Sequence, residues 1–310
     1  KLFGLCLIGL AFAASFEVLE EERFQFDQFV SQYNKVYSTA EETAQRLEIF
    51  VDNLRFINDH NSKAQNFTVG VNKFADMTNE EFTATYLKKR PANFGEDSPR
   101  IEYADSLLAN AASSLDWRDS GVVQSVKDQA QCGSCWAFST VSTVETSNAQ
   151  KSGKLLSLSE QQLVDCDTSD DGCDGGIQGW AMAWLKKNGG LCLEADYPYT
   201  AKDGRCKTTC SKHATISSWA QLKKDSEDDL MKAMQVSTVS VSMDAEGRWF
   251  QLYESGVYSG RCGYELDHAV VGVGYGVDNG QDYWTIRNSW GSDWGEEGYF
   301  RIASDKGLCG

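Results

Sequence analysis

Gln129-Ala-Gln-Cys-Gly-Ser-Cys-Trp136 is the stretch that decides how this chain is interpreted. Its two cysteines, Cys132 and Cys135, form a Cys-x-x-Cys pattern that three chemistries use. A zinc site would need a second ligand pair at the usual spacing, and none follows in the sequence. A thioredoxin-like redox pair would need a small βαβ context, which the flanking sequence lacks. The third interpretation is a disulfide cysteine next to a cysteine that acts as a nucleophile.

The cysteine count favours this third interpretation. The chain has ten cysteines; Cys6 lies in an N-terminal apolar run, and the nine that remain all follow residue 131. An odd number leaves one thiol outside any bridge in a secreted protein. A cysteine nucleophile reacts as its thiolate, and Cys135 stands at the predicted start of a helix, where the backbone dipole favours an anion.

The first residues predict a secretory signal peptide over residues 1–14. Lys1 precedes a short apolar run with the small-residue pattern Ala11-Phe12-Ala13. The run is too short for a membrane helix, which needs about 20 apolar residues. Because the sequence starts with Lys, we expect this signal to be partial. A signal peptide implies an oxidising compartment, in which cysteines pair.

Length and charge narrow the class of protein. The 310 residues are enough for two units of ordinary size. The formal net charge of −16 argues against a nucleic-acid partner. No other stretch is apolar enough to cross a membrane, and no ligand pattern predicts a metal or a cofactor.

The chain changes character near residue 110. The preceding segment is charged, and a helix is expected from Glu42 to Asn61, where apolar residues recur at three- and four-residue spacing. Asn66-Phe67-Thr68 is a sequon, so Asn66 is a candidate glycosylation site. Residues 87–112 are rich in Asn, Gly, Asp, Ser and Ala and indicate an exposed connector of the kind that proteases cut.

The second segment predicts helices first and strands later. The pattern favours helices after Cys135, over 159–164 and over 177–187, and strands over 239–243, 268–275 and 283–287. This order predicts an α+β domain with two lobes, and a cleft between the lobes would be the active site.

Three histidines could serve as the base for Cys135. His60 lies in the N-terminal segment, and His213 lies in a polar stretch. His268 begins an apolar strand, where a core histidine would be the ordinary interpretation. Asn288 follows the next predicted strand, and an Asn side chain can fix the tautomer and orientation of a histidine. This partner favours His268 as the base.

The sequence resembles the papain family of cysteine proteases, close to its cathepsin L branch. It has Cys132-Gly-Ser-Cys-Trp136, with His268 and Asn288 far downstream. The similarity covers nearly the whole chain. The family's ERFNIN propeptide pattern is matched by Glu42, Arg46, Phe50, Asn53, Ile57 and Asn61. Its GNFD motif is matched by Gly70, Asn72, Phe74 and Asp76. Further landmarks are Asp116-Trp117-Arg118, Ser159-Glu160-Gln161, Gly172 to Gly176, and Trp294-Gly295.

The resemblance implies a papain-like fold with a helical left lobe and a β-barrel-like right lobe. An inhibitory propeptide would cover residues 15–111 and a peptidase domain residues 112–310. The chain would be the zymogen of a cysteine endopeptidase. Expected partners are protein and peptide substrates, the chain's own propeptide and cystatin-type inhibitors. We expect a monomer in the secretory pathway, in a lysosome or endolysosomal vacuole or outside the cell.

The resemblance also implies a role for each site residue. Cys135 would attack the scissile carbonyl, and His268 would protonate the leaving amine. Asn288 would orient His268, and Trp290 would shield their hydrogen bond from water. The Gln129 side chain and the Cys135 backbone N–H would form the oxyanion hole.

The implied substrate cleft and disulfides follow from the same matching. Gly175 and Gly176 would offer their backbone to an extended substrate. A pocket for a bulky apolar P2 residue would be lined by Ile177, Gln178, Ser242, Leu266 and Ala269. The implied bridges are Cys132–Cys173, Cys166–Cys206 and Cys262–Cys309, with Cys192 and Cys210 left to form a fourth.

Two features depart from the family pattern. Ala130 stands where relatives have glycine, and a positive φ there would strain an alanine. Relatives also continue past the position of Gly310, so we expect this sequence to lack the base of the P2 pocket.

Three alternatives remain at this point. An exopeptidase of the family would need an insertion that blocks the cleft, and the sequence has none. A silent binding or storage protein would have lost its nucleophile. A redox protein would form a bridge between Cys132 and Cys135.

Overall fold

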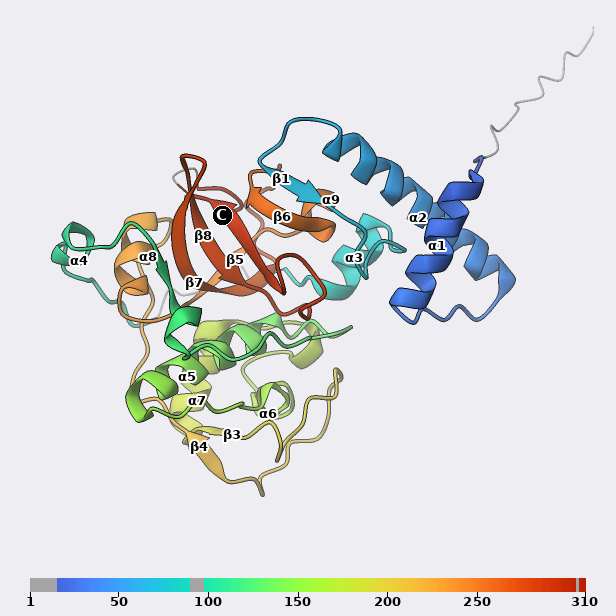
Figure 1. Ribbon diagram of the computed structural model, residues 1–310. Helices are drawn as coiled ribbons and strands as arrows, with labels where there is room; N and C mark the ends of the chain where they lie inside the picture. Colours follow the sequence, from blue (N-terminus) through green and yellow to red (C-terminus); the bar gives the residue numbers. More distant parts are fainter. Residues whose placement is uncertain (1–15, 90–97, 305–306) are drawn as a thin grey trace, which may run out of the picture.

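The computed structural model describes residues 16–89, 98–304 and 307–310. The expected signal peptide with Cys6, and part of the connector, lie outside these residues. The described chain forms a helical N-terminal part, a helical lobe and a lobe built on a sheet, as Figure 1 shows. The expected α+β, papain-like architecture is therefore confirmed. None of the described helices is both long and apolar enough to cross a membrane.

The N-terminal part consists of α1 (Glu20–Gln32), α2 (Ala40–Asn61) and α3 (Asn79–Tyr86). Thr39 caps α2 by accepting a hydrogen bond from the Glu42 N–H, so the helix begins close to the predicted position. The buried residues of α2 include the five apolar positions that predicted it, Leu47, Phe50, Val51, Leu54 and Ile57. The predicted apolar face is thus the face that packs.

Polar residues of α2 hold the segment that follows it. Arg46 reaches Glu81 of α3 through two hydrogen bonds of 2.6 and 3.0 Å. The buried Asn53 amide donates to the carbonyls of Ala75 and Met77. These contacts fix the loop before α3, because they satisfy backbone groups that the loop itself leaves open.

The helical lobe is built around α5 (Cys135–Ser152), with α6 (Glu160–Cys166) and α7 (Gln178–Asn188) against it. Two short strands, β3 (Leu191–Cys192) and β4 (Lys212–Ala214), complete this lobe. Trp136 and Val141 of α5 are fully buried. The predicted helices are confirmed, although α5 runs to Ser152 and α6 begins at Glu160.

The second lobe is a mostly antiparallel sheet. Its strand order is β1-β6-β9-β8-β7-β2, and β5 also pairs with β7. The strands are β1 (Phe67–Val69), β2 (Leu115–Asp116), β5 (Val239–Met243), β6 (Tyr253–Tyr258), β7 (His268–Asp278), β8 (Gln281–Arg287) and β9 (Tyr299–Ala303). The N-terminal segment thus adds β1 to the edge of this sheet. The short helices are η1 (Trp117–Ser120), η2 (Gly172–Asp174), α4 (Ser106–Ala109), α8 (Glu227–Met234) and α9 (Arg248–Gln251).

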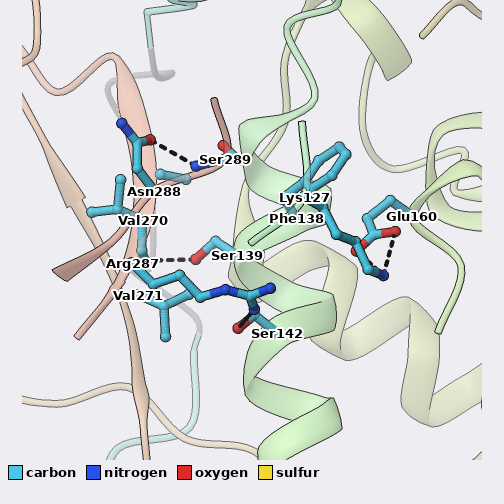
Figure 2. Close-up of a pocket in the computed structure, with 11 residues that line it drawn as sticks. Lys127, Phe138, Ser139, Ser142, Glu160, Val270, Val271, Arg287, Asn288 and Ser289 are labelled. Atoms are coloured by element: carbon cyan, nitrogen blue, oxygen red, sulfur yellow. Dashed lines mark hydrogen bonds and ion pairs between the residues drawn. The ribbon is translucent and has the colours of Figure 1, made fainter. Parts of the chain in front are cut away.

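The two lobes meet where α5 packs on β7. Ser139 of α5 donates a hydrogen bond to the Val270 carbonyl of β7, at 2.7 Å. Arg287 at the end of β8 donates to the Ser142 hydroxyl of α5 (Figure 2). A small cavity at this junction is lined by residues of both lobes, including Asn288 and Ser289.

Candidate active site

Cys135 is the first residue of α5, and 5% of its surface is exposed. It is the only cysteine in the described part of the chain that takes part in no disulfide. The first turn of a helix presents unsatisfied N–H groups and the positive end of the helix dipole, and both favour a thiolate. The position therefore suits a nucleophilic cysteine.

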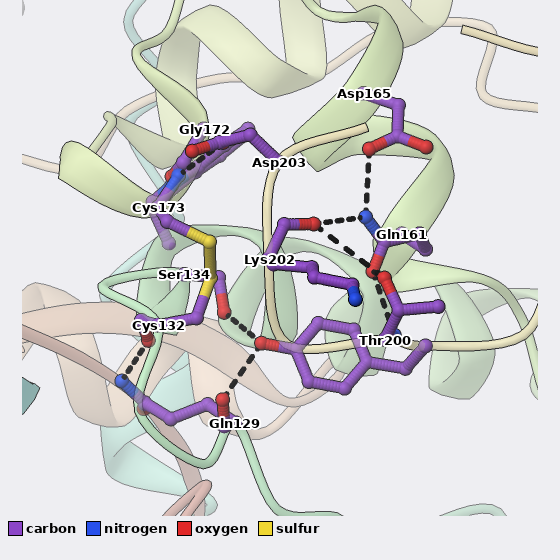
Figure 3. Close-up of a disulfide and its surroundings, with 12 residues drawn as sticks. Gln129, Cys132, Ser134, Gln161, Asp165, Gly172, Cys173, Thr200, Lys202 and Asp203 are labelled. Atoms are coloured by element: carbon purple, nitrogen blue, oxygen red, sulfur yellow. Dashed lines mark hydrogen bonds between the residues drawn. A yellow bond between two sulfur atoms is a disulfide. The ribbon is translucent and has the colours of Figure 1, made fainter. Parts of the chain in front are cut away.

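Cys132 is joined to Cys173, which anchors the loop ahead of Cys135 (Figure 3). The Gly133 N–H also donates to the Cys173 carbonyl, at 2.8 Å. A redox pair would have required a bridge between Cys132 and Cys135, and the structure has a different one. The other bridges are Cys166–Cys206, Cys192–Cys210 and Cys262–Cys309.

His268 is the first residue of β7, and the contact between the lobes brings it toward α5. Ser139 lies one helical turn after Cys135, and Val270 lies two residues after His268. Residues four apart on a helix, and two apart on a strand, lie on the same face. The Ser139–Val270 hydrogen bond therefore brings the faces of Cys135 and His268 together.

Asn288 fixes the tautomer of His268. The Asn288 Oδ1 atom lies 2.8 Å from His268 Nε2 and accepts a hydrogen bond from the Ser289 N–H, also at 2.8 Å. A backbone N–H can only donate, so the shared Asn288 atom is an oxygen, and Nε2 must carry a proton. The other ring nitrogen, Nδ1, is buried without a hydrogen-bond partner among the described residues. Nδ1 is therefore the atom that can accept a proton.

Trp290 covers the His268 ring. The two rings are stacked with centroids 4.6 Å apart, and Trp290 is fully buried. Burial lowers the pKa of His268 to about 4, and the hydrogen bond to Asn288 opposes this shift only in part. The ring is therefore neutral above that pH in this structure, because burial disfavours the charged form.

Gln129 is fully buried and lies next to Ser289, the residue after Asn288. Its Nε2 donates to the Cys132 carbonyl at 3.0 Å and to the Tyr86 carbonyl at 3.3 Å. Its Oε1 accepts a hydrogen bond from the Ser289 hydroxyl, at 2.6 Å. The amide thus has a fixed orientation, with its N–H groups directed at carbonyl oxygens.

The chain after α3 passes between the lobes. The Lys88 N–H donates to the Asp267 carbonyl at 3.0 Å on the sheet side. On the helical side, a Cβ added to Gly175 would lie 3.0 Å from the Lys88 Cβ. Gly176 has other surroundings, since a Cβ there would lie 2.5 Å from the Trp136 ring. Of the two glycines, Gly175 is the one that faces the passing segment.

The residues expected around the P2 pocket come from the start of α7 and the residue before it, from β5 and β7, and from the loop before β7. Ile177, the residue before α7, is fully buried, and the first residue of α7, Gln178, donates a hydrogen bond to the Ser242 hydroxyl at 3.0 Å. Ser242 stands opposite Ala269 in the β5–β7 pairing. Leu266 lies near the last residue, since a Cβ on Gly310 would be 2.6 Å from its Cδ2.

Two further predicted positions can be compared with the structure. Ala130 has a φ of +49°, so the alanine adopts the left-handed conformation that glycine tolerates better. Its N–H donates to Asp128 Oδ1 at 2.8 Å. Asn66 is exposed just before β1, and its glycosylation stays a prediction.

Three residues of the site were not found by sequence reasoning. Ser289 holds Gln129, although the two are 160 residues apart. The Tyr199 hydroxyl donates to the Gln129 carbonyl at 2.7 Å and contacts the Ser134 hydroxyl. Asp267, next to His268, is buried, and this burial raises its pKa to about 7. Only the position of Asp267 beside His268 offered a local signal, because the other two contacts join distant segments.

Comparison with known proteins agrees with this geometry. Residues 111–310 match the model for the papain family of cysteine proteases, and residues 26–82 match the cathepsin propeptide inhibitor domain (I29). The chain is 50% identical over 279 residues to the probable cysteine protease RD21B of Arabidopsis thaliana, with 87% of this chain and 59% of the relative covered. It is 47% identical over 276 residues to the cysteine proteinase RD21A of the same plant, with 87% and 60% covered. The chain thus spans about 60% of the length of these relatives.

Solved precursor structures show the same arrangement. Recombinant stem bromelain precursor has a TM-score of 0.88 and 39% identity, with 94% of this chain and 96% of that chain covered. Digestive procathepsin L2 proteinase from the larval midgut of Tenebrio molitor has a TM-score of 0.87 and 37% identity, with 93% and 96% covered. The chain therefore belongs to the papain family of cysteine proteases and carries a cathepsin-type propeptide inhibitor domain ahead of its protease domain.

Proposed function

We propose that the chain is the zymogen of a cysteine endopeptidase. The Cys135 thiolate attacks the scissile carbonyl, and the His268 imidazolium gives its proton to the leaving amine. Water then hydrolyses the acyl-enzyme. The observation that carries this proposal is the pair of hydrogen bonds to Asn288 Oδ1, which keeps the proton of the neutral ring on Nε2 and leaves Nδ1 to accept the thiol proton.

The oxyanion of the tetrahedral intermediate is bound by the Gln129 amide and the Cys135 backbone N–H. A donor helps most when it is oriented before the charge develops, and one such donor is worth about 3 kcal/mol. The hydrogen bond from Ser289 to Gln129 Oε1 supports this role, because it holds the amide in place without using its N–H groups.

The propeptide, residues 15–111, inhibits the protease domain, residues 112–310, by occupying the cleft. The Tyr86 carbonyl already takes a hydrogen bond from Gln129, and Lys88 lies between Gly175 and Asp267. The propeptide runs against the direction of a substrate, which keeps it from being cut there. Cleavage near residue 110 at acid pH then releases it.

The substrates are proteins and peptides with a bulky apolar residue at P2. Ile177 and Ala269 are apolar and Ser242 is small. A pocket lined by these residues favours an apolar side chain over a charged one. The four disulfides support an oxidising location in the secretory pathway, a lysosome or vacuole, or outside the cell.

The test is to acidify the purified precursor and assay a Phe-Arg peptide amide with and without an epoxide inhibitor of cysteine proteases. We expect activity to appear with propeptide removal and to vanish with the inhibitor and in Cys135→Ala. Activity that survives Cys135→Ala would refute the mechanism. An internally quenched peptide blocked at both ends separates the two kinds of peptidase, because an exopeptidase leaves it intact.

A further inference from the structure

Lys73 of the propeptide inserts between two carboxylates of the protease domain. Its Nζ lies 2.5 Å from Asp128 Oδ2 and 3.4 Å from Asp293 Oδ1. Only 16% of the Lys73 side chain is exposed, against 43% and 50% for the two carboxylates. The lysine is therefore a largely covered cation that the protease domain binds, although it belongs to the segment that activation would remove.

The backbone of the protease domain is shaped for this contact. Gly291 has a φ of +73°, and a Cβ there would lie 2.8 Å from Asp293 Oδ1 and 3.2 Å from both Asp128 Oδ2 and Lys73 Nζ. The three charged groups therefore converge where glycine leaves room. The Gly291 N–H donates to the Lys127 carbonyl, which fixes this turn. Asp128 directs its other oxygen, Oδ1, to the Ala130 N–H, so Oδ2 is left for the cation.

The path of the propeptide shows which end of the cleft holds the two carboxylates. Tyr86 lies at Gln129, and Lys88 lies at Gly175, next to the proposed P2 pocket. Lys73 instead contacts Asp128, the residue before Gln129, and the next propeptide residue, Phe74, packs edge-on against the Trp290 indole at 5.6 Å. Because Trp290 covers His268, the proposed proton donor to the leaving amine, this contact puts the carboxylates toward the residues that would follow the scissile bond in a substrate.

Removal of the propeptide takes away the cation that these carboxylates bind. The carboxylates of Asp128 and Asp293, held together at the turn around Gly291, then favour another cationic side chain at the position that Lys73 held. We propose that Asp128 and Asp293 of the mature enzyme form a subsite for a Lys or Arg side chain on the leaving-group side of the substrate. This inference rests on the proposed endopeptidase function and adds a specificity to it.

The experiment uses the mature enzyme and internally quenched peptides with one shared sequence before the scissile bond. Lys and Gln are compared at P1′, P2′ and P3′ in turn. We expect kcat/KM to be about threefold to fivefold higher for Lys at one of these positions, as a partly exposed ion pair allows, and this ratio to fall toward one in 0.5 M NaCl.

In the variant Asp128→Asn/Asp293→Asn, the ratio of kcat/KM for Lys over Gln should fall to about one. Asn keeps an oxygen for the Ala130 N–H but carries no charge. Asp282→Asn, an exposed carboxylate at the far end of β8, is the matched control and should keep the ratio. Titration with the epoxide inhibitor reports whether each variant has an assembled site. The salt dependence of the unmodified enzyme provides a test that does not depend on the folding of any variant.

The outcomes separate the two proposals. Equal kcat/KM for Lys and Gln at all three positions would overturn the subsite and leave the endopeptidase intact. A Lys preference that persists in the double variant would overturn it as well. Cleavage of neither peptide by the acid-activated enzyme would count against the endopeptidase function itself.

Discussion

The side-chain amide of Gln129 donates a hydrogen bond to the backbone carbonyl of Tyr86, with 3.3 Å between Nε2 and the oxygen. Tyr86 is the last residue of α3, so the acceptor lies in the segment that we propose as the propeptide. The second acceptor of the same amide is the Cys132 carbonyl, and because carbonyls only accept, the identity of Nε2 is certain. The carbonyl of Tyr86, in the proposed propeptide, thus occupies the donor that we propose for the oxyanion of a substrate.

The first prediction concerns this donor. In the mature enzyme, Gln129→Ala should lower kcat by about 100- to 1000-fold with a smaller change in KM, because the lost donor acts mainly on the charge of the transition state. Steady-state kinetics with the blocked peptide measure both constants. Gln131→Ala, an exposed glutamine two residues later, is the control and should keep its kcat. A Gln129→Ala enzyme with full kcat would exclude Gln129 from the oxyanion hole.

A second prediction concerns the orientation of the base. Asn288→Ala should lower kcat/KM by about 100-fold, because the imidazole loses the acceptor that fixes its tautomer and its position. Binding of a fluorescent epoxide probe and the thermal unfolding midpoint show whether the protein stays folded. Asn188→Ala, at the exposed end of α7, should behave as the unmodified enzyme. Full activity of Asn288→Ala would mean that Trp290 stacking alone orients the ring.

The third prediction concerns pH. Burial holds the pKa of His268 at about 4 in the precursor, so the covered ring binds fewer protons than an exposed imidazole, which titrates near 6.5. Acidification from about pH 6.5 to about pH 4 therefore favours the state in which the propeptide has left the cleft, because His268 can be protonated there. Propeptide affinity should fall across this window.

NMR titration of the imidazole signals checks this directly. The Cys135→Ala precursor removes the thiolate that would otherwise raise the histidine pKa, and the chain has only three histidines. His213→Gln identifies the exposed one. We expect one ring to titrate near pH 4 in the precursor and at a higher pH after propeptide removal. A His268 signal that titrates above pH 6 in the precursor would contradict the proposed coupling.

The fourth prediction concerns the strained alanine. Ala130→Gly should leave stability unchanged or raise it by up to about 1 kcal/mol, because glycine relieves the left-handed strain but gains freedom in the unfolded chain. Denaturant unfolding of the Cys135→Ala background measures the difference. Ala183→Gly, at an exposed position inside α7, should instead cost about 1 kcal/mol. Equal losses in both variants would show that the positive φ at Ala130 carries no strain.

Much of the fold was predictable from local pattern. The apolar spacing of α2 and the alternation in β5 were visible because each reflects which face of a single element is buried. The edge strand β1 and the short helices α8 and α9 were not found. They are short, and their stability comes from neighbours that are distant in the sequence, as the pairing of Phe67 with Gly256 illustrates.

The candidate site divides in the same way. Residue type and position were enough to propose Cys135, His268 and Asn288, because the chemistry demands a thiol, an imidazole and an amide, whereas Gln129 was implied only by the resemblance to the family. The protonated nitrogen of His268, by contrast, follows from the Ser289 N–H that identifies the Asn288 oxygen. Likewise, the contact of Lys73 with Asp128 and Asp293 unites three separate segments. Such hydrogen-bond directions and charge neighbours depend on how distant segments are placed in space, so the folded chain had to supply them.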